Sequence, residues 1–343
     1  MNVLLLAGGN SSERQVSLDS GAAILRALRA LGHTVEAVDP ALGMALIEGD
    51  HGLIPRDTAV RATKHDQLPV AAQEFRQLVL SDRRRSFDVV FLGLHGGAGE
   101  NGTIQNLLDL AGLPYTGSGM AASAVAMDKA LTKRLMISSG IPTPEFRHLK
   151  VNRHPVTPEV IDSLLESPGL PMIVKPNDSG STVGLSKVMS SGELPEAIER
   201  CRVESASILV EAYVAGREMT VAVLDGEALP VVEIRPRSGL YDYEAKYTKG
   251  KTEYLAPAPI DQQTAAGMQA AAVRLYEVIG AAGLARVDFM LDSGDRFFCL
   301  ELNTLPGMTE LSLSPMAARA VGMSFEELVR RIVESAIREF KLK

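Results

Sequence analysis

Oxygen-bearing side chains interrupt an apolar run near the end of the chain. The segment LELNTLPGMTELSL (300–313) begins like a buried strand, yet it carries Glu301 and Asn303 two residues apart. Because successive side chains of a strand point to opposite faces, Glu301 and Asn303 are predicted to share one face. Carboxylate and amide oxygens suit a hard cation such as Mg²⁺, which usually keeps waters and substrate phosphates among its ligands.

A hairpin is predicted to bring further polar side chains to this face. RVDFML (286–291) and RFFCLEL (296–302) flank DSGD (292–295), and Ser293-Gly294 predicts a tight turn between them. With the turn centred there, position 288 lies opposite 299 and position 286 opposite 301. One face then carries Val287, Phe289, Leu291, Phe298, Leu300 and Leu302, and the other carries Arg286, Asp288, Met290, Phe297, Cys299, Glu301 and Asn303.

Two interpretations of the polar face remain open at this point. Asp288, Glu301 and Asn303 are candidate metal ligands, with Arg286 beside them and a glycine-containing loop close by. An ordinary solvent-exposed face with charge pairs across the strands has the same residue types. Motifs elsewhere in the chain are needed to choose between a metal site and a solvent-exposed face.

A phosphate site is predicted in VKPNDSGSTVGLSKV (174–188), where a loop of small residues joins two strands. Such a strand-loop-strand can lay backbone amides over phosphates, with Lys175 at its entrance, although a plain β-turn has a similar composition. Lys129, in the segment MDK (127–129), offers a second cation. There is no Walker-type loop, because Ala245 stands where that pattern requires the glycine preceding GKT (250–252).

Alternating strands and helices are predicted to position these residues. Strands near 3–7, 33–40 and 88–94 alternate with helices near 24–32 and 103–111, which favours a parallel α/β sheet. Ser12 and Gln15 form a capping-box pattern at the start of the first helix. Later strands are predicted at 171–176, 208–214 and 219–224, and later helices at 121–139, 265–280 and 324–340. The polar, tyrosine-rich segment 235–257 has the length of a loop that closes over a site.

Length and composition narrow the class of protein. A chain of 343 residues that is 46% hydrophobic is expected to form two or three packed domains. Its formal net charge of -7 argues against general affinity for nucleic acid or anionic membranes. Two cysteines without metal-type spacing predict a reducing compartment. Neither a signal peptide nor an apolar run long enough to span a bilayer is predicted.

Taken together, these segments resemble D-alanine–D-alanine ligases of the ATP-grasp superfamily. Seven of them occur in the order of that family: GGNSSERQVSLDSG (8–21), LHGGAGENGTIQ (94–105), MDK (127–129), KPNDSGSTVG (175–184), YDYEAKY (241–247), RVDFM (286–290) and LELNTLPGMT (300–309). Each is weak alone, but seven in register over nearly the whole chain are highly specific.

The resemblance implies a fold of mixed α/β and α+β type. It predicts an N-terminal α/β, Rossmann-like domain over 1–117 that binds substrate. It also predicts a central ATP-grasp domain over 118–214 and a C-terminal catalytic ATP-grasp domain over 215–343. The last of these would carry a lid loop at about 235–257, and ATP would lie between the sheets of the two ATP-grasp domains.

The resemblance also implies roles for individual residues at the nucleotide. Lys129 and Lys175, together with Lys246 from the lid, are expected at the ATP phosphates. Glu211 is expected near the adenine and Glu218 near the ribose. Asp288, Glu301 and Asn303 are expected to hold two Mg²⁺ or Mn²⁺ ions.

A second set of residues is expected at the substrates. Glu13 would bind the ammonium group of the first D-alanine, and Ser181 and Tyr247 would hydrogen-bond with Glu13. His95 would lie near the second D-alanine, whose carboxylate Ser312 and the Leu313 backbone would receive. Arg286 and the Gly307 amide would stabilise the oxyanion of a tetrahedral intermediate.

The implied activity is the ATP-dependent joining of two D-alanines, through an acyl phosphate, for peptidoglycan synthesis. An acceptor such as D-lactate or another amino acid is the alternative. Tyr247 favours the dipeptide, whereas Glu310 departs from the family pattern close to the acceptor end. A non-catalytic homologue would be expected to lose ligands that this chain retains. A cytoplasmic homodimer without nucleic-acid or membrane partners is expected.

Overall fold

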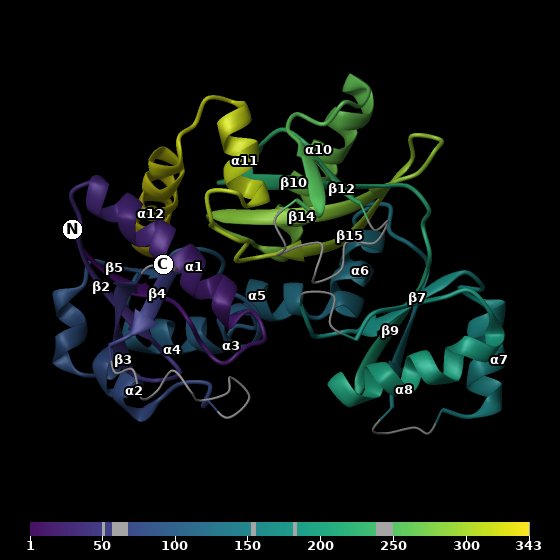
Figure 1. Ribbon diagram of the computed structural model, residues 1–343, viewed down its shortest axis with the longest axis horizontal. Coiled ribbons are helices and arrows are strands. Elements are labelled where there is room, and N and C mark those ends of the chain that lie inside the picture. The colour runs from purple at the N-terminus through teal and green to yellow at the C-terminus, as the bar shows by residue number, and fades with distance from the viewer. Residues whose placement is uncertain (50–51, 57–67, 152–155, 181–183, 238–249, 343) are drawn as a thin grey trace.

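The computed structural model describes residues 1–343 except for 50–51, 57–67, 152–155, 181–183, 238–249 and 343. Three sheets form the framework of the molecule, and each is built from a separate stretch of the chain (Figure 1). The strands of the first lie within residues 2–92, those of the second within 146–212 and those of the third within 217–303. Each sheet therefore falls within one of the three predicted domains, whose exact limits remain a prediction.

The N-terminal sheet has five strands in the order β4-β3-β2-β1-β5. Its strands are β1 (Asn2–Leu6), β2 (Thr34–Asp39), β3 (Met44–Gly49), β4 (Gly52–Pro55) and β5 (Val89–Leu92). The pairs of β1 with β2 and β5 are parallel, as predicted. β3 and β4 were not predicted, and they add to the edge antiparallel. The short turn at Gly43 explains their direction, since a parallel connection requires a crossover of a dozen or more residues.

Helices of the N-terminal part cover this sheet. They are α1 (Arg14–Ala30), α2 (Gln73–Leu80), the 3-10 helix η3 (Asp82–Ser86), α3 (Gly97–Glu100) and α4 (Thr103–Ala111). The first helix begins where predicted, but the capping box is wrong. Glu13 occupies the N-cap position without a side-chain cap, and the Gln15 amide donates to Asp19 at 2.9 Å.

The second sheet is antiparallel, with the order β6-β9-β7-β8. Its strands are β6 (Phe146–Lys150), β7 (Met172–Pro176), β8 (Ser186–Val188) and β9 (Ser207–Ala212). Helices α7 (Pro158–Glu166) and α8 (Leu194–Glu204) share a buried apolar cluster with it, and the 3-10 helix η4 (Ser191–Glu193) precedes α8. The helices that come first in this part, α5 (Met120–Met127) and α6 (Lys129–Ser138), instead share a core with the third sheet.

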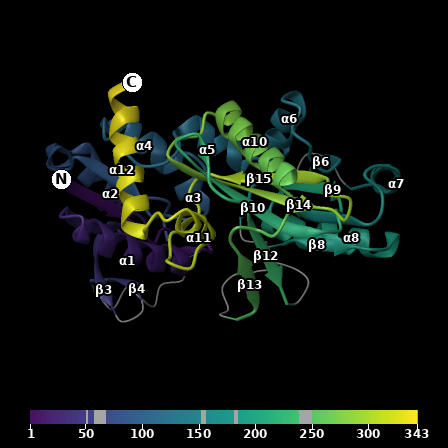
Figure 2. The same ribbon diagram turned by 90° about the horizontal axis from the view of Figure 1, so that it is seen from above.

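The third sheet has the order β13-β12-β10-β14-β15, with β11 paired to β10. Its strands are β10 (Arg217–Leu224), β11 (Glu227–Ala228), β12 (Val232–Pro236), β13 (Thr252–Leu255), β14 (Leu284–Leu291) and β15 (Phe297–Asn303). The predicted lid thus starts and ends in paired strands, which extend away from the rest of the sheet in Figure 2. Its middle, 238–249, lies outside the described residues.

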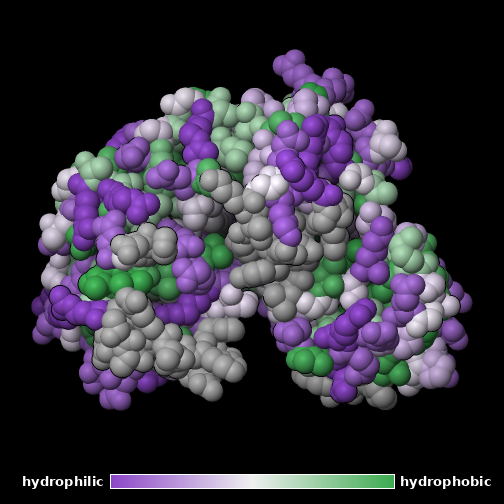
Figure 3. Space-filling model, in the orientation of Figure 1, coloured by the Kyte–Doolittle hydropathy of each residue, from purple (hydrophilic) through white to green (hydrophobic). Residues whose placement is uncertain are grey.

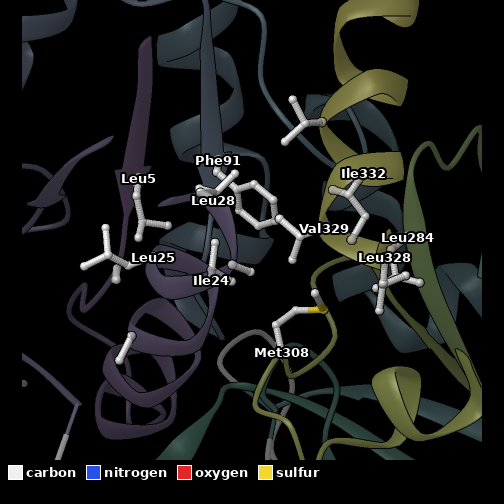
Figure 4. Packing of buried hydrophobic residues seen from close by; sticks show 14 of the residues in the cluster. Leu5, Ile24, Leu25, Leu28, Phe91, Leu284, Met308, Leu328, Val329 and Ile332 are labelled. Carbon is white, nitrogen blue, oxygen red and sulfur yellow. The ribbon is translucent and has the colours of Figure 1, made fainter. Parts of the chain in front are cut away.

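Three further helices complete the C-terminal part: α10 (Gln262–Ile279), α11 (Leu313–Ala320) and α12 (Phe325–Leu342). Helix α12 packs on α1, so both ends of the chain lie in the same part of the molecule (Figure 1). Figure 4 shows the apolar core at this junction, which includes Leu28 of α1, Phe91 of β5 and Val329 of α12. Met308 closes the same core, which anchors the segment that follows β15.

The predicted register of the β14–β15 hairpin is wrong. Phe289 lies opposite Cys299, whereas Asp288 lies opposite Glu301, so a β-bulge leaves Leu300 without a partner. The turn is also longer than predicted, because Asp292 caps it by accepting from the Gly294 and Arg296 amides, at 2.9 and 3.0 Å.

The bulge decides which side chains of β15 face the site. Cys299 becomes fully buried among apolar side chains, whereas Leu300 and Glu301 both line a cavity. Bulges commonly re-aim side chains next to active sites, and a prediction from strict alternation cannot anticipate this one.

Hydrophilic side chains are spread over the face shown in Figure 3, with small apolar areas between them. Among the described residues, none of the helices has the length and apolar character needed to cross a membrane.

Candidate functional site

A cavity of about 500 Å³ lies between the four-stranded and the six-stranded sheet. Lys175 of β7 and Glu211 of β9 line one wall, and Glu218 of β10 lines the other. The other charged residues of its lining are Lys129, Arg217, Glu233, Arg235, Arg286, Asp288 and Glu301. Apolar side chains such as Ile173 and Met290 lie between them. Apolar walls with a few convergent charged groups are typical of a site for a polar, charged ligand.

Asp288 lies at the centre of a hydrogen-bonded group on β10, β14 and β15. Its Oδ1 accepts from the Thr220 hydroxyl at 2.6 Å and from Nε of Arg286 at 2.8 Å. Its Oδ2 accepts from Nη2 of Arg286 at 2.8 Å and from Nδ2 of Asn303 at 3.0 Å. Glu301 is the cross-strand partner of Asp288. The three predicted metal ligands therefore come together at one place.

The chemistry of this group fits a hard divalent cation, because it offers two carboxylates and one amide oxygen. Over the part of the chain that the structure describes, no cluster of three or more His, Cys, Asp or Glu side chains could hold a metal. The candidate set therefore depends on Asn303 for its third protein ligand. Asn303 presents its amide nitrogen to Asp288, and a half-turn of the amide would present its oxygen instead.

The two predicted phosphate-binding lysines reach the cavity from different elements. Lys129 is the first residue of α6, and its Nζ donates to the Ser179 carbonyl at 2.7 Å. The same Nζ lies 3.3 Å from a carboxylate oxygen of Glu301. Nζ of Lys175 lies 2.5 Å from Oε1 of Glu211, on the neighbouring strand. Each lysine thus holds a carboxylate of the site.

Glu211 is buried and stays ionised because two lysines surround it. Its Oε2 also lies 2.8 Å from Nζ of Lys133. Burial by itself would raise the pKa of the Glu211 carboxyl, but Lys133 and Lys175 outweigh it and lower that pKa to about 2. Lys133 was not predicted from the sequence. Its position one helical turn after Lys129 was the only available signal.

Asn177 was also missed, although it follows the predicted phosphate-loop lysine closely. Its Oδ1 accepts from the Ala130 amide at 2.7 Å, and its Nδ2 donates to Asp128 at 2.9 Å. Asp128 in turn caps α6 by accepting from the Leu131 amide at 2.9 Å. These bonds hold the start of α6, and hence Lys129, beside the loop that follows β7.

Glu13 lies where three segments of the chain meet. A methyl group on Gly96 would lie 2.5 Å from its Oε2, and one on Gly180 would lie 2.9 Å from the same atom. The N-terminal part therefore reaches the loop after β7 through this carboxylate, and glycine makes both approaches possible. Burial raises the pKa of the nearby Glu100 carboxyl to about 8, and the charge of Glu13 adds to the effect.

His95 is buried, and both its ring nitrogens are engaged within the protein. Its Nδ1 lies 3.0 Å from the Leu305 carbonyl, which can only accept, so Nδ1 donates. Its Nε2 then accepts from the Ser20 hydroxyl at 2.9 Å, and Ser20 Oγ accepts from the Met308 amide at 3.2 Å. Burial lowers the pKa of His95, which keeps the ring neutral. The ring connects the N-terminal part to the segment that follows β15.

Gly307, Ser312 and Leu313 lie together at the start of α11. Ser312 occupies the N-cap position, and its Oγ accepts from the Thr309 amide at 3.1 Å. A methyl group on Gly307 would lie 3.0 Å from that Oγ. Helix N-termini favour carboxylate groups, as the predicted acceptor role requires. Ser181, Lys246 and Tyr247 lie outside the described residues.

Two sheets that enclose a cavity lined by lysines and carboxylates define the ATP-grasp class of fold. The D-alanine-D-alanine ligase from Coxiella burnetii has a similar structure, with a TM-score of 0.81 and 26% identity over 100% of this chain and 95% of that chain. The D-alanine--D-alanine ligase from Bacillus anthracis complexed with ATP has a TM-score of 0.78 and 27% identity, over 100% of this chain and 99% of that chain.

Comparisons of sequence identify the family. The family models described as D-ala D-ala ligase N-terminus and C-terminus match residues 2–118 and 135–334. D-alanine--D-alanine ligase from Syntrophotalea carbinolica is 43% identical over 97% of this chain and 95% of its own length. D-alanine--D-alanine ligase from Gloeobacter violaceus is 41% identical over 98% of this chain and 100% of its own length. The chain belongs to the D-alanine–D-alanine ligase family.

Proposed function

We propose that this protein joins two molecules of D-alanine to D-alanyl-D-alanine while ATP is converted to ADP and phosphate. The observation that carries the proposal is the cavity between the two sheets, where Lys129 and Lys175 face Asp288 and Glu301. Membership of the family and the similarity to a ligase complexed with ATP support the same function.

In the first step, a carboxylate oxygen of one D-alanine attacks the γ-phosphorus of ATP and ADP leaves. An acyl phosphate results. Phosphoryl transfer depends mainly on positioning and on neutralisation of charge. Lys129 and Lys175 supply that neutralisation from the loop side, and Glu218 orients the nucleotide from the opposite wall. Glu13 holds the ammonium group of this D-alanine.

Asp288, Glu301 and Asn303 would hold divalent cations, with Mg²⁺ or Mn²⁺ as the proposed ions. Bound there, such ions orient the phosphates and offset their negative charge. Arg286 keeps the Asp288 carboxylate in position through two hydrogen bonds.

In the second step, the amine of the other D-alanine attacks the acyl carbon and phosphate leaves. The tetrahedral intermediate places negative charge on the former carbonyl oxygen. Arg286 and the Gly307 amide are the proposed donors to that oxygen. Ser312 and the Leu313 amide receive the carboxylate of the acceptor at the start of α11. His95 supports this side of the site by holding the segment from Leu305 to Met308.

The cellular setting follows from the proposed function. The product supplies peptidoglycan synthesis, which places the enzyme in the cytoplasm. Cys201 and Cys299 are both free and buried, as a reducing compartment permits. The homodimer and the closing of the lid over the nucleotide remain predictions from family resemblance.

Release of ADP, coupled to NADH oxidation, tests the proposal with D-alanine as the only amino substrate. Turnover is expected, and mass spectrometry should detect D-alanyl-D-alanine as the product. A parallel reaction with added D-lactate tests the alternative acceptor. Absence of turnover with D-alanine alone, together with turnover once D-lactate is added, would overturn the assignment.

A further inference from the structure

Lys133 is a buried cation close to the nucleotide cavity but not part of its lining. It lies on α6, one turn after Lys129, and its side chain is 0% exposed. Its Nζ is 2.8 Å from Oε2 of Glu211 and 2.7 Å from Oγ1 of Thr143. The ring of Phe146 lies 5.7 Å from the same atom. Lys133 is therefore shielded from solvent, and it is not among the residues that line the cavity.

Thr143 extends this contact to the strand that carries Glu301. Its hydroxyl accepts from Lys133 and donates to the Cys299 carbonyl at 2.8 Å. The Cys299 amide donates to the Pro142 carbonyl at 2.7 Å, so the segment after α6 is fixed to β15 at two points. Lys133 therefore occupies one position, determined by α6, β9 and β15 together.

Glu211 is shared between this fixed lysine and a second one that faces the cavity. Lys175 reaches Oε1 of Glu211 and lines the cavity, whereas Lys133 reaches Oε2 from behind. Removal of the only cation that pairs with a buried carboxylate destabilises the folded protein by several kcal/mol. With two partners, it can release one and keep the other.

We propose that Lys133 is the permanent counter-ion of Glu211, and that it allows Lys175 to leave Glu211 for a phosphate of ATP. This inference rests on the proposed function, because it takes Lys175 to bind ATP. Lys133 is a positioning residue in this scheme, since it acts on the nucleotide only through Glu211 and Lys175. Without Lys133, Lys175 would be held as the sole partner of Glu211.

A double-mutant cycle on Lys133 and Glu211 tests the proposal. The dissociation constant of MgATP is measured by calorimetry for wild type, Lys133→Met, Glu211→Gln and the double variant. Lys133→Met is expected to weaken binding at least about tenfold when Glu211 is present, and less than about threefold in the Glu211→Gln background. Lys150→Met, at an exposed position on β6, is the matched control and should bind as wild type does.

The outcomes separate this inference from the function on which it rests. Equal losses in both backgrounds, or no loss in either, would overturn the role of Lys133. If Lys133→Met does not fold, Lys133→Gln takes its place in the same cycle and is judged by the same two criteria. If Lys175→Met binds MgATP as tightly as wild type does, the proposed role of Lys175 at the phosphates is wrong.

Discussion

Replacement of Glu211 by glutamine is expected to destabilise the fold in a manner that depends on pH. Glu211 is the only acidic partner that the structure shows for Lys133, among the residues it describes, and both side chains are almost completely buried. In Glu211→Gln the amide keeps the shape of the side chain but removes its charge. Two buried lysines then face a neutral group, which is the situation that makes a broken buried ion pair strongly destabilising.

The size of the effect follows from the displaced pKa. Burial opposes ionisation, yet Lys133 and Lys175 move the pKa of the Glu211 carboxyl from 4.5 to about 2. At about 1.4 kcal/mol for each tenfold change in the acid constant, this corresponds to about 3 kcal/mol of stability at pH 7. Because the folded pKa is the lower one, that stability is present above pH 4.5 and is lost as the pH falls toward 2.

Urea unfolding measures this prediction. The chain has no tryptophan, so the transition is followed by far-ultraviolet circular dichroism. The free energy of unfolding of Glu211→Gln should be lower than that of wild type by about 3 kcal/mol at pH 7. The difference should narrow below pH 4.5. Glu227→Gln, which removes an exposed partner of Arg331, is the control and should change little. A Glu211→Gln difference that is absent at pH 7, or that widens toward acid pH, would refute the reasoning.

Three further predictions concern other parts of the site. Asp288→Asn should lower turnover more than loss of a group that only supports a metal ligand, which typically costs roughly 10–100-fold. Its circular dichroism spectrum should match that of wild type. Unchanged activity would contradict the metal assignment. Glu100→Gln should stabilise the protein by an amount that grows from pH 4.5 to about 8, because burial and the Glu13 charge raise the pKa of Glu100 and ionisation there opposes folding. Urea unfolding at pH 5 and pH 8 checks this, and equal effects at both would count against it. Gly216→Ala should destabilise the folded protein by about 1–3 kcal/mol, because the added methyl group would meet the Leu291 carbonyl. Thermal unfolding measures this effect. Gly192→Ala, whose methyl group would face open space, is the control and should change the melting temperature little.

Much of the fold could be predicted from patterns in the chain. The strands β1 and β5 consist largely of continuous apolar runs, which is typical of parallel strands buried on both faces. The added edge strands β3 and β4 were missed, since both are short and are bounded by glycine or proline. The segment 235–257 was predicted as one long loop, and the strands β12 and β13 at its two ends were missed because they are short.

The candidate site could be predicted by residue type but not by arrangement. Asp288, Glu301 and Asn303 were found from their spacing, although the register that brings Asp288 opposite Glu301 depends on the bulge at Leu300. His95 was expected near a substrate, and the structure shows both its nitrogens bound within the protein. No pattern in the chain indicates those partners, because they lie 75 and 210 residues away.

By itself, the sequence determined the family, the mixed α/β class and the charged residues available for chemistry, because these depend on residue type and local spacing. The tertiary structure decided which of their atoms meet. The bulge that turns Glu301 toward Asp288 and the burial of Lys133 behind Glu211 both arise from packing between distant elements. Packing is a property of the whole folded chain, and so these contacts could be seen only in the structure.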